Sequence, residues 1–263
     1  MHLLEHPLSS YAQKAKMALR EKGIAFTSEI PAGLGSGDLS GPLTQANPRT
    51  EVPTLIDGTV RVWDSSVILQ YLEDKQPEPA LLPADPAARA RARMIEDVCD
   101  TQYEAINWGL GEIRFFGRAK GALAERLEKA AAAQTGELLA WLTQQLDGKD
   151  WFEGKAFGWT DLCVAPFVNR SDYYGLGPKA GSALHAWLQR LRERPSIATT
   201  FKEFRAAADA MSDASKRLET PGFRRQYRDH RLEWMLKSGG LDIVLDGLKR
   251  KNIRFNWPFA KPS

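Results

Sequence analysis

Short hydrophobic runs separated by polar turns occupy roughly the first 75 residues, and longer stretches with helical spacing fill the rest of the chain. The apolar pair Leu3-Leu4 predicts a short buried strand, and the loosely alternating segment 25–30 predicts a second one. Residues 52–56 and 59–63 are two more β-rich runs, joined by the turn pair Asp57-Gly58 that is typical of a hairpin. The order of strands and helices in this part predicts a mixed α/β unit.

The segment between the first two strands predicts an amphipathic helix. Tyr11, Ala15 and Leu19 recur at intervals of four residues and therefore share one face. Gly23 follows the helix and suits a C-terminal cap. The other face carries charged side chains, namely Lys14, Lys16, Arg20, Glu21 and Lys22. The first helix thus divides into an apolar side and a charged side.

Two serines open this helix. Ser10 and Gln13 have the spacing of a capping box, which predicts that the Ser10 hydroxyl caps the helix. Ser9 is then spare, and it lies just outside a helix N-terminus, where unpaired N–H groups and a partial positive charge favour an anion. A thiolate placed there would be stabilised by the helix dipole and by a hydroxyl donor. The alternatives for Ser9 are capping and a place in a solvated loop.

Helical spacing dominates after a proline-rich segment, 75–85, that is typical of an interdomain linker. Residues 86–118 and 123–146 are long, alanine-rich and charged, as the helices of an antiparallel bundle are. Further helices are expected at 183–192 and from Pro195 onward. The second part of the chain is therefore expected to be all-helical.

These patterns predict an α/β domain at 1–76 and an all-α region from residue 86 onward. A length of 263 residues and a hydrophobic content of 43% are enough for sizeable cores in both domains. The formal net charge is only +3, so nothing in the overall charge requires nucleic acid or a membrane as a partner.

The cysteines and histidines bear on compartment and metal chemistry. Cys99 and Cys163 lie far apart and outside any CxxC pattern, so we expect buried, reduced thiols in a cytoplasmic protein. The four histidines show no metal-ligand spacing, and no metal is expected. No run of 18 apolar residues occurs, and the chain enters a strand too early for a signal peptide.

Three separated segments together resemble the glutathione transferase superfamily. Residues 7–19 look like its active-site segment and first helix. Asn47 to Leu55 reads N-P-x-x-x-V-P-x-L, which is similar to the family's segment with a cis-proline, here Pro53. Asp64-Ser65, followed by the helical stretch 67–72, looks like the family's pair of an acidic residue and a serine. One such motif would be weak, whereas three in order at the family's spacing are specific.

The resemblance implies a thioredoxin-like N-terminal domain that binds glutathione and an all-α helical bundle domain that binds a hydrophobic electrophile. It makes Ser9 the catalytic, thiol-activating residue of a serine-type enzyme. It implies that the Val52 backbone pairs with the cysteinyl part of glutathione beside Pro53, and that Asp64 and Ser65 hold the γ-glutamyl end. No cysteine stands at the position of Ser9, which argues against thiol-exchange chemistry.

Two residues depart from the family's pattern. Many relatives have proline where this chain has Ser10, so Ser10 competes with Ser9 as the thiolate donor and is a second candidate contact for glutathione. Glu51 stands where Lys, Arg or Gln is common, and a carboxylate there repels the glycyl carboxylate unless it points away. Arg49 or a residue of the loop 31–37 can substitute for that contact. The serine pair is similar to that of the zeta class, and the lysine-rich helix to that of bacterial and tau-like members.

The helical half carries two further resemblances. Residues 157–161, before the apolar segment 162–168, resemble the family's capping motif Ser/Thr-x-x-Asp, but Gly158 stands at the Ser/Thr position. Asp161 can still pair with backbone N–H groups at that helix start and serve folding rather than catalysis. Tyr103 and Trp108 lie in the region of the family's fourth helix that faces the active site. Most aromatic residues at such spacing belong to a core, but these two are our candidates for substrate binding.

The resemblance implies an all-α domain at 86–210 and leaves 211–263 as a C-terminal extension. The segment from 220 to 263 is its unusual part. It holds a basic cluster, namely Arg224, Arg225, Arg228, His230 and Arg231. Such a cluster binds nucleic acid or solvates the outer face of a helix packed on the body, and we expect the second. Residues 241–248 predict an amphipathic helix, and Trp257-Pro258-Phe259 adds apolar groups near the end. We expect the extension to pack on its own subunit as a wall of the electrophile site.

The sequence thus predicts a cytoplasmic, homodimeric transferase for detoxification, with glutathione as cosubstrate and a small hydrophobic electrophile as partner. The alternative within enzymes is a specialised glutathione-dependent ether cleavage, dehalogenation or isomerisation. The alternative from another class is a non-catalytic binding or interaction protein on the same fold, which Glu51 favours. Neither nucleic acid nor a membrane is expected as a partner.

Overall fold

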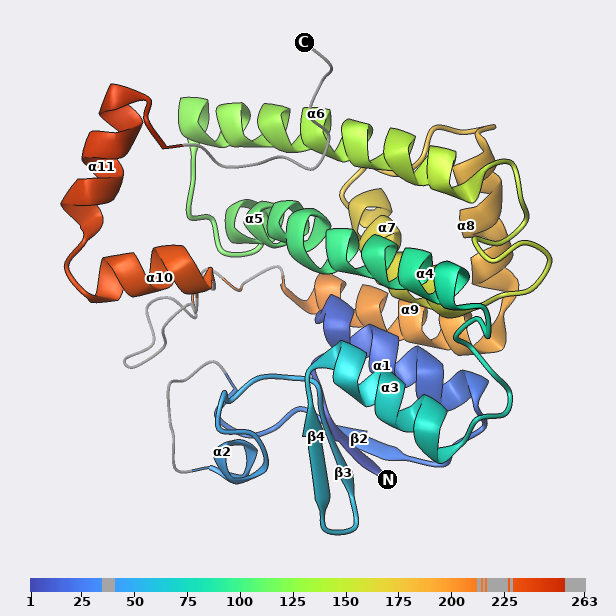
Figure 1. Ribbon diagram of the computed structural model, residues 1–263. Coiled ribbons are helices and arrows are strands. Elements are labelled where there is room, and N and C mark those ends of the chain that lie inside the picture. The colour runs from blue at the N-terminus through green and yellow to red at the C-terminus, as the bar shows by residue number, and fades with distance from the viewer. Residues whose placement is uncertain (35–40, 212–213, 215, 217–226, 228, 254–263) are drawn as a thin grey trace.

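The computed structural model describes residues 1–34, 41–211, 214, 216, 227 and 229–253. It shows a four-stranded mixed sheet with helices, followed by an all-helical domain (Figure 1). This is the α/β thioredoxin-like domain and the helical bundle domain that the sequence predicted. None of the described helices is long and apolar enough to cross a membrane.

The N-terminal domain has four short strands and three helices. They are β1 (His2–Leu4), α1 (Ser10–Glu21), β2 (Thr27–Glu29), α2 (Pro42–Ala46), β3 (Thr54–Asp57), β4 (Val60–Trp63) and α3 (Ser65–Lys75). The predicted hairpin is present, because β3 and β4 pair antiparallel across Asp57-Gly58, with Gly58 at a φ of 58°. A positive φ at this position suits glycine, which has no Cβ to clash.

The sheet order is β2-β1-β3-β4. β1 pairs parallel with β2 and antiparallel with β3, so that Leu3 lies opposite Leu55 at the centre of the sheet. Both leucines are fully buried. The sheet therefore places the end of β1 next to the start of β3, and the two loops that carry the predicted glutathione contacts emerge from these ends.

The second domain consists of helices that follow the proline-rich linker. They are α4 (Pro86–Val98), α5 (Glu104–Arg114), α6 (Gly121–Leu146), α7 (Trp159–Tyr173), α8 (Ala183–Glu193) and α9 (Pro195–Asp209). A π-helical turn, Cys99–Tyr103, separates α4 from α5, where the sequence predicted one long helix. Such turns insert an extra residue and are frequent at functional sites. Here the turn lies at the interface between the two domains.

Asp161 confirms the capping motif that the sequence predicted at the start of α7. Its carboxylate accepts hydrogen bonds from the backbone N–H groups of Gly158 and Phe152 and from the indole N–H of Trp187. Asp161 thereby joins the first turn of α7 to the preceding loop and to α8. Cys99 and Cys163 are free and buried, as expected.

The charged side of α1 does not face solvent. In Figure 1 this helix lies between the sheet and the helical domain, and it packs against α3, α7 and α9. Lys14, Lys16 and Lys22 are buried, and each pairs with a carboxylate; the partners of Lys16 and Lys22 include Glu5 at 2.9 Å and Glu73 at 2.6 Å. Helical spacing separated the two faces of α1 correctly but did not reveal that a second domain covers the charged one.

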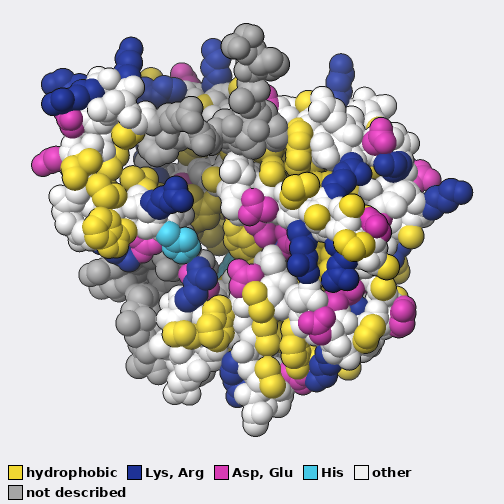
Figure 2. Space-filling view, in the orientation of Figure 1, with side chains coloured by type: hydrophobic (Ala, Val, Ile, Leu, Met, Phe, Trp, Pro, Cys, Tyr) yellow, Lys and Arg dark blue, Asp and Glu magenta, His cyan; other side chains and the backbone are white. Residues whose placement is uncertain are grey.

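The extension contributes two described helices, α10 (His230–Lys237) and α11 (Leu241–Arg250). Their large apolar side chains are exposed, namely Trp234, Leu236, Leu241, Ile243, Leu245 and Leu248. Hydrophobic side chains gather on this part of the molecule, at the left of Figure 2. The apolar stripe of α11 is thus not buried against the described part of the subunit. His230 and Arg231 are exposed, whereas Arg224, Arg225, Arg228 and Trp257-Pro258-Phe259 lie outside the described residues.

Tyr227 forms one of the described contacts between the extension and the body. Its ring meets that of Trp108 on α5 edge-to-face at 4.5 Å, and its hydroxyl donates to Glu112 at 3.1 Å. The Arg118 guanidinium lies over the same ring. Tyr227 therefore anchors the extension beside α5.

Candidate active site

The loop between β1 and α1 is held by its own side chains. The His6 Nδ1 atom accepts a hydrogen bond from the backbone N–H of Leu8, and the Gln13 amide donates to the Pro7 carbonyl. Gln13 is therefore not part of a capping box with Ser10, as its spacing had predicted. This loop fixes the direction in which Ser9 enters the helix.

Ser9, not Ser10, is the N-cap of α1. Its Oγ atom accepts a hydrogen bond of 3.2 Å from the backbone N–H of Ala12, and its backbone is extended, as at an N-cap. The prediction that Ser10 caps the helix and leaves Ser9 spare was wrong. The Ser9 hydroxyl donates to none of the described residues, so its proton stays available at a half-buried helix N-terminus.

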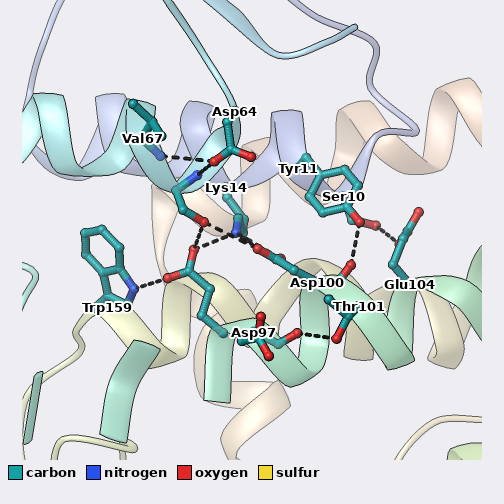
Figure 3. A network of polar contacts seen from close by, with 12 residues as sticks. Ser10, Tyr11, Lys14, Asp64, Val67, Asp97, Asp100, Thr101, Glu104 and Trp159 are labelled. Atoms are coloured by element: carbon teal, nitrogen blue, oxygen red, sulfur yellow. Dashed lines mark hydrogen bonds and ion pairs between the residues drawn. The ribbon is translucent and has the colours of Figure 1, made fainter. Parts of the chain in front are cut away.

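Ser10 is fully buried and points into the helical domain (Figure 3). Its hydroxyl donates to Glu104 Oε2 at 2.8 Å, and Glu104 Oε1 accepts a bond of 3.1 Å from Arg170 on α7. Burial raises the pKa of the Glu104 carboxyl, and the neighbouring Arg170 and Ser10 only partly oppose this. The Ser10 proton is thus committed to an interdomain contact.

The predicted cis peptide is present between Val52 and Pro53. Asn47 shapes this turn, because its amide donates to the Glu51 carbonyl and to Thr54 Oγ1. The Val52 backbone N–H and carbonyl bond to none of the residues that the structure describes, and Val52 is half-buried. A main-chain donor and acceptor are therefore left open just before β3.

Asp64 and Ser65 form the start of α3. Asp64 has a φ of 71°, which is unusual for a residue other than glycine, and its Oδ1 accepts from the N–H groups of Ser66 and Val67. The side chain is exposed, so the second carboxylate oxygen faces outward. Ser65 is buried, and among the described residues its hydroxyl has no hydrogen-bond partner. Both residues thus keep polar atoms free at a helix N-terminus.

Glu51 forms an ion pair with Arg49. Its carboxylate lies 3.3 Å from the Arg49 guanidinium, and only 16% of its side chain is exposed. The two opposite charges partly cancel at the position where the family's pattern has a cation or an amide. This arrangement weakens, but does not remove, the negative charge near the turn before Val52.

A buried charge network joins the two domains behind these loops (Figure 3). Lys14 Nζ lies 2.7 Å from Glu96 Oε1 and 2.6 Å from Asp100 Oδ2. The Ser66 hydroxyl and the Trp159 indole N–H donate to Glu96 at 2.6 and 2.7 Å. The network therefore ties α1 and α3 of the first domain to α4 and α7 of the second.

The charges in this network shift one another's ionisation. Burial raises the pKa of Asp100 to about 6, although Lys14 opposes the shift. Burial also disfavours charge on Lys14, but Asp100, Cys163 and Glu96 outweigh it and hold the Lys14 pKa well above its usual range. For Glu96, Lys14 and the hydrogen bonds from Ser66 and Trp159 overcome burial and lower the pKa.

Sequence reasoning did not single out the carboxylates of this interface. Glu96, Asp100 and Glu104 recur every four residues, which places acidic groups on one stripe of α4 and α5. In a helix that is otherwise alanine-rich and charged, such a stripe is not distinctive. The role of the stripe can be recognised only in the structure, where Lys14 and Ser10 of α1 face it.

The two predicted substrate-binding aromatics differ in position. Tyr103 is fully buried and stacks on Phe167 at 6.1 Å, so it is a core residue and offers no surface to a ligand. Trp108 is half-buried and meets Tyr227 of the extension. Next to Ser9, Leu8 packs with an apolar cluster made of Phe116, Met211 and Ala214. Phe116, Met211 and Ala214 are buried, whereas Leu8 is half-buried.

A thioredoxin-like sheet with a cis-proline before β3, joined to an all-helical domain, defines the two-domain architecture of a glutathione transferase. The family model described as "Glutathione S-transferase, N-terminal domain" matches residues 8–75, and the one described as "Glutathione S-transferase, C-terminal domain" matches residues 87–190. These two ranges correspond to the helix-and-sheet unit and to the helices from α4 to α8.

Curated relatives agree with the family models. Glutathione S-transferase U28 of Arabidopsis thaliana is 32% identical over 76% of this chain and 88% of its own length. Maleylacetoacetate isomerase of Pseudomonas aeruginosa is 29% identical over 80% of this chain and 96% of its own length. The chain therefore belongs to the glutathione S-transferase family.

A solved structure supports the same assignment. The theta class glutathione S-transferase of Xanthomonas axonopodis pv. citri, with glutathione bound, superimposes with a TM-score of 0.62 at 29% identity. The match covers 76% of this chain and 96% of that one.

Proposed function

We propose that this protein is a serine-type glutathione transferase that directs the glutathione thiolate at a small hydrophobic electrophile. The observation that carries the proposal is the difference between the two serines. The Ser9 hydroxyl caps α1 as an acceptor and keeps its proton free at the helix N-terminus, whereas the Ser10 proton is committed to Glu104. A free donor and a helix dipole at one point stabilise a thiolate there.

The open polar groups of the first domain fit glutathione. The unpaired Val52 backbone offers a donor and an acceptor for the cysteinyl part of the tripeptide. The N-terminus of α3 suits the α-carboxylate of the γ-glutamyl end, with Ser65 as a donor and Asp64 as an acceptor for its ammonium group. Glutathione supplies the nucleophilic sulfur, and Ser9 holds it as a thiolate without attacking the substrate itself.

The electrophile is expected on the side of Ser9 that faces the helical domain. Leu8 and Trp108 are both half-buried and supply apolar surface there. These side chains favour an apolar substrate over a charged one. Tyr103 is not part of this proposal because it is buried in the core.

A glutathione-dependent isomerisation is a second candidate within enzymes, since a maleylacetoacetate isomerase is among the relatives. A non-catalytic binding protein is the candidate from another class, and the carboxylate of Glu51 favours it. Arg49 reduces the force of that argument by neutralising part of the charge. We also propose the cytoplasm as the compartment, in keeping with the buried free thiols of Cys99 and Cys163.

Calorimetric titration with glutathione tests the binding that every enzymatic version needs. Wild type is expected to bind glutathione, and Glu51→Gln is expected to bind it more tightly by a few fold, because a charge that repels the glycyl carboxylate is removed. γ-Glutamylcysteine, which lacks the glycyl residue, is the matched control ligand. Its affinity should be the same for both proteins.

Absence of glutathione binding by wild type and by Glu51→Gln would favour the non-catalytic protein. Weaker binding by Glu51→Gln would mean that Glu51, with Arg49, contributes to the glycyl contact. An equal gain for both ligands would show that Glu51 acts on the turn before Val52 rather than on the glycyl carboxylate.

We propose that the protein is a homodimer. Apolar side chains on neighbouring elements of the two domains are exposed, with Trp63 on β4, Val67 on α3 and Met94 on α4. In Figure 1, α3 and α4 face the same side of the molecule. Burial of this surface against a second copy would remove it from water.

Truncation of the extension separates a role at the electrophile site from a role in assembly. Deletion of 220–263 removes Tyr227 from Trp108 and is expected to broaden the range of electrophiles or abolish turnover, because a wall beside α5 is lost. Deletion of 230–263 keeps Tyr227 and should change selectivity much less. Turnover with electrophiles of different size and size-exclusion chromatography are the measurements.

Both truncated proteins are expected to remain dimers. If both become monomers with unchanged selectivity, the exposed apolar side chains of α10 and α11 form a dimer clasp and the wall at the electrophile site is contradicted. Equal selectivity of the two truncated proteins would remove Tyr227 from the proposal.

A further inference from the structure

Helices α10 and α11 carry an apolar surface that the described part of the subunit does not cover. Six large side chains are between 46% and 66% exposed, namely Trp234, Leu236, Leu241, Ile243, Leu245 and Leu248. Single exposed apolar side chains are common on proteins, whereas a group of this size on two successive helices indicates an interaction site. Both helices lie beyond residue 190, where the match to the family's C-terminal domain ends.

The apolar side chains of α11 form a stripe along the helix. Leu241, Leu245 and Leu248 recur at intervals of four and three residues, so they share one face. Among the described elements α11 packs chiefly on α10, and the two helices form the left edge of the molecule in Figure 1. The stripe is therefore accessible to a large partner.

Positive charge is concentrated in the same part of the chain. Residues 220–263 contain ten Lys and Arg but only four Asp and Glu, which gives this segment a formal net charge of +6. The whole chain has a net charge of +3, so residues 1–219 together carry −3. The overall charge, which gave no reason to expect a membrane, therefore conceals a basic segment that also carries the apolar stripe.

Most acidic groups of the two helices are already compensated. Glu233 and Asp246 each pair with a basic residue four positions later on the same helix. Asp242 lies in the first turn of α11, where a negative charge suits the helix dipole. Arg231 and Lys249 are exposed and form no ion pair within the part of the chain that the structure describes. Lys249 follows Leu245 by four positions, which places this cation at the edge of the stripe.

The combination of exposed leucines and uncompensated cations favours an anionic lipid surface over other partners. A second copy of the segment would bring two basic regions together, and like charges repel each other. A nucleic acid would neutralise the cations through its phosphates but has no apolar interior for leucine side chains. A membrane with anionic lipids supplies both contacts, because its headgroups attract Lys and Arg while its acyl chains take up apolar side chains.

We propose that α10 and α11 bind the surface of a bilayer that contains anionic phospholipids. The leucine stripe of α11 enters the boundary between headgroups and acyl chains, and Arg231 and Lys249 stay at the level of the phosphates. Trp234, on α10, lies at the same interface, where indole rings are favoured. The two helices lie on the membrane without spanning it. This contact involves neither Ser9 nor glutathione.

Co-sedimentation of the full chain with extruded vesicles tests the proposal. Saturable binding is expected to vesicles made of equal parts of phosphatidylcholine and phosphatidylglycerol. Binding to vesicles of phosphatidylcholine alone should be at least about tenfold weaker, because the attraction of the cations to the headgroups is lost. On the mixed vesicles the tryptophan emission should shift to shorter wavelength, and this shift should be smaller in Trp234→Phe than in wild type.

A leucine variant, Leu241→Ser combined with Leu245→Ser, tests whether the stripe enters the bilayer. It is expected to bind the mixed vesicles at least about tenfold more weakly, since two apolar side chains no longer leave water. Both positions are exposed, so the substitutions remove no core packing. Size-exclusion chromatography and the far-ultraviolet circular dichroism of the variant should match those of wild type.

A cation variant, Arg231→Gln combined with Lys249→Gln, tests the attraction to the headgroups. It should weaken binding to the mixed vesicles about tenfold or more. The matched control variant is Lys155→Gln combined with Lys179→Gln, which removes the same charge from two exposed positions outside the extension. The control variant should bind as wild type does.

Four results would overturn the proposal. They are no binding of wild type to the mixed vesicles, equal affinity for the two kinds of vesicle, equal affinity of the cation and control variants, and undiminished binding by the leucine variant. The last result would mean adsorption by charge alone, as to any polyanion. If the leucine variant also lost its dimeric state, the stripe would be a contact between copies. Failure of glutathione to bind would contradict the proposed transferase but leave the predicted vesicle affinities unchanged.

Discussion

Lys14→Met is expected to lower the free energy of unfolding by about 3–5 kcal/mol, the cost of breaking a buried ion pair by removing one partner. The Lys14 side chain is fully buried and contacts both Glu96 and Asp100. Methionine fills much of the same volume, so the loss comes mainly from two carboxylates that no longer face a cation. Unfolding in urea, followed by circular dichroism, measures the difference.

The matched control is Lys149→Met. Lys149 pairs with Asp147 on the surface, where both side chains are well exposed. Removal of such a pair should cost no more than about 1 kcal/mol. A loss for Lys14→Met as small as that of the control would contradict a structural role of the buried network.

The loss of stability in Lys14→Met should depend on pH, and the direction follows from how the pKa values of Asp100 and Glu96 are shifted. Without the cation, burial raises the pKa values of Asp100 and Glu96 above their unfolded-state values. The folded protein then binds more protons than the unfolded one, so the variant gains stability relative to wild type as the pH falls through these raised pKa values. In wild type the Asp100 pKa is already about 6. The deficit of the variant should therefore be largest near neutral pH and shrink toward pH 4.

Local patterns predicted the parts of this molecule that depend on neighbouring residues. The β3–β4 hairpin follows from Asp57-Gly58, whereas the cap of α7 by Asp161 was predicted from a resemblance to the family's capping motif. The cis bond before Pro53 came from the family resemblance rather than from chain geometry, since most bonds before proline are trans. Each of these features is set within a few residues of sequence.

Contacts between the two domains were beyond the reach of sequence patterns. Lys14 meets partners 82 and 86 residues away, and Ser10 meets Glu104 94 residues away. The charged face of an amphipathic helix usually faces solvent. The charged face of α1 instead packs against carboxylates of the second domain. Nothing in the first 75 residues shows that this domain covers the helix.

The assignment of the two serines shows the same limit at the candidate site. The spacing of Ser10 and Gln13 fits a capping box, but Glu104 takes the Ser10 hydroxyl and the Pro7 carbonyl takes the Gln13 amide. Ser9 then becomes the cap. The position of Ser9 as the N-cap strengthens its proposed role, because the hydroxyl oxygen is fixed as an acceptor while its proton remains free to donate.

Ser9→Ala is expected to reduce turnover with glutathione about 10- to 150-fold, which corresponds to the loss of one charged hydrogen bond of about 1.5–3 kcal/mol. It should also cost about 1 kcal/mol of stability, because Ser9 caps α1. Ser9→Gly separates the two effects, since glycine is tolerated at an N-cap with a loss of only a few tenths of a kcal/mol. It should lose as much turnover as Ser9→Ala, while Ser9→Thr restores part of it.

The direct readout is the pKa of the thiol of bound glutathione, followed by the ultraviolet absorbance of the thiolate. Loss of the Ser9 donor should raise that pKa by about one to two units. Ser10→Ala is the neighbouring control: it breaks the bond to Glu104 and should cost stability while leaving the thiol pKa nearly unchanged. Unchanged turnover in Ser9→Ala, together with a collapse in Ser10→Ala, would transfer the thiol-activating role to Ser10.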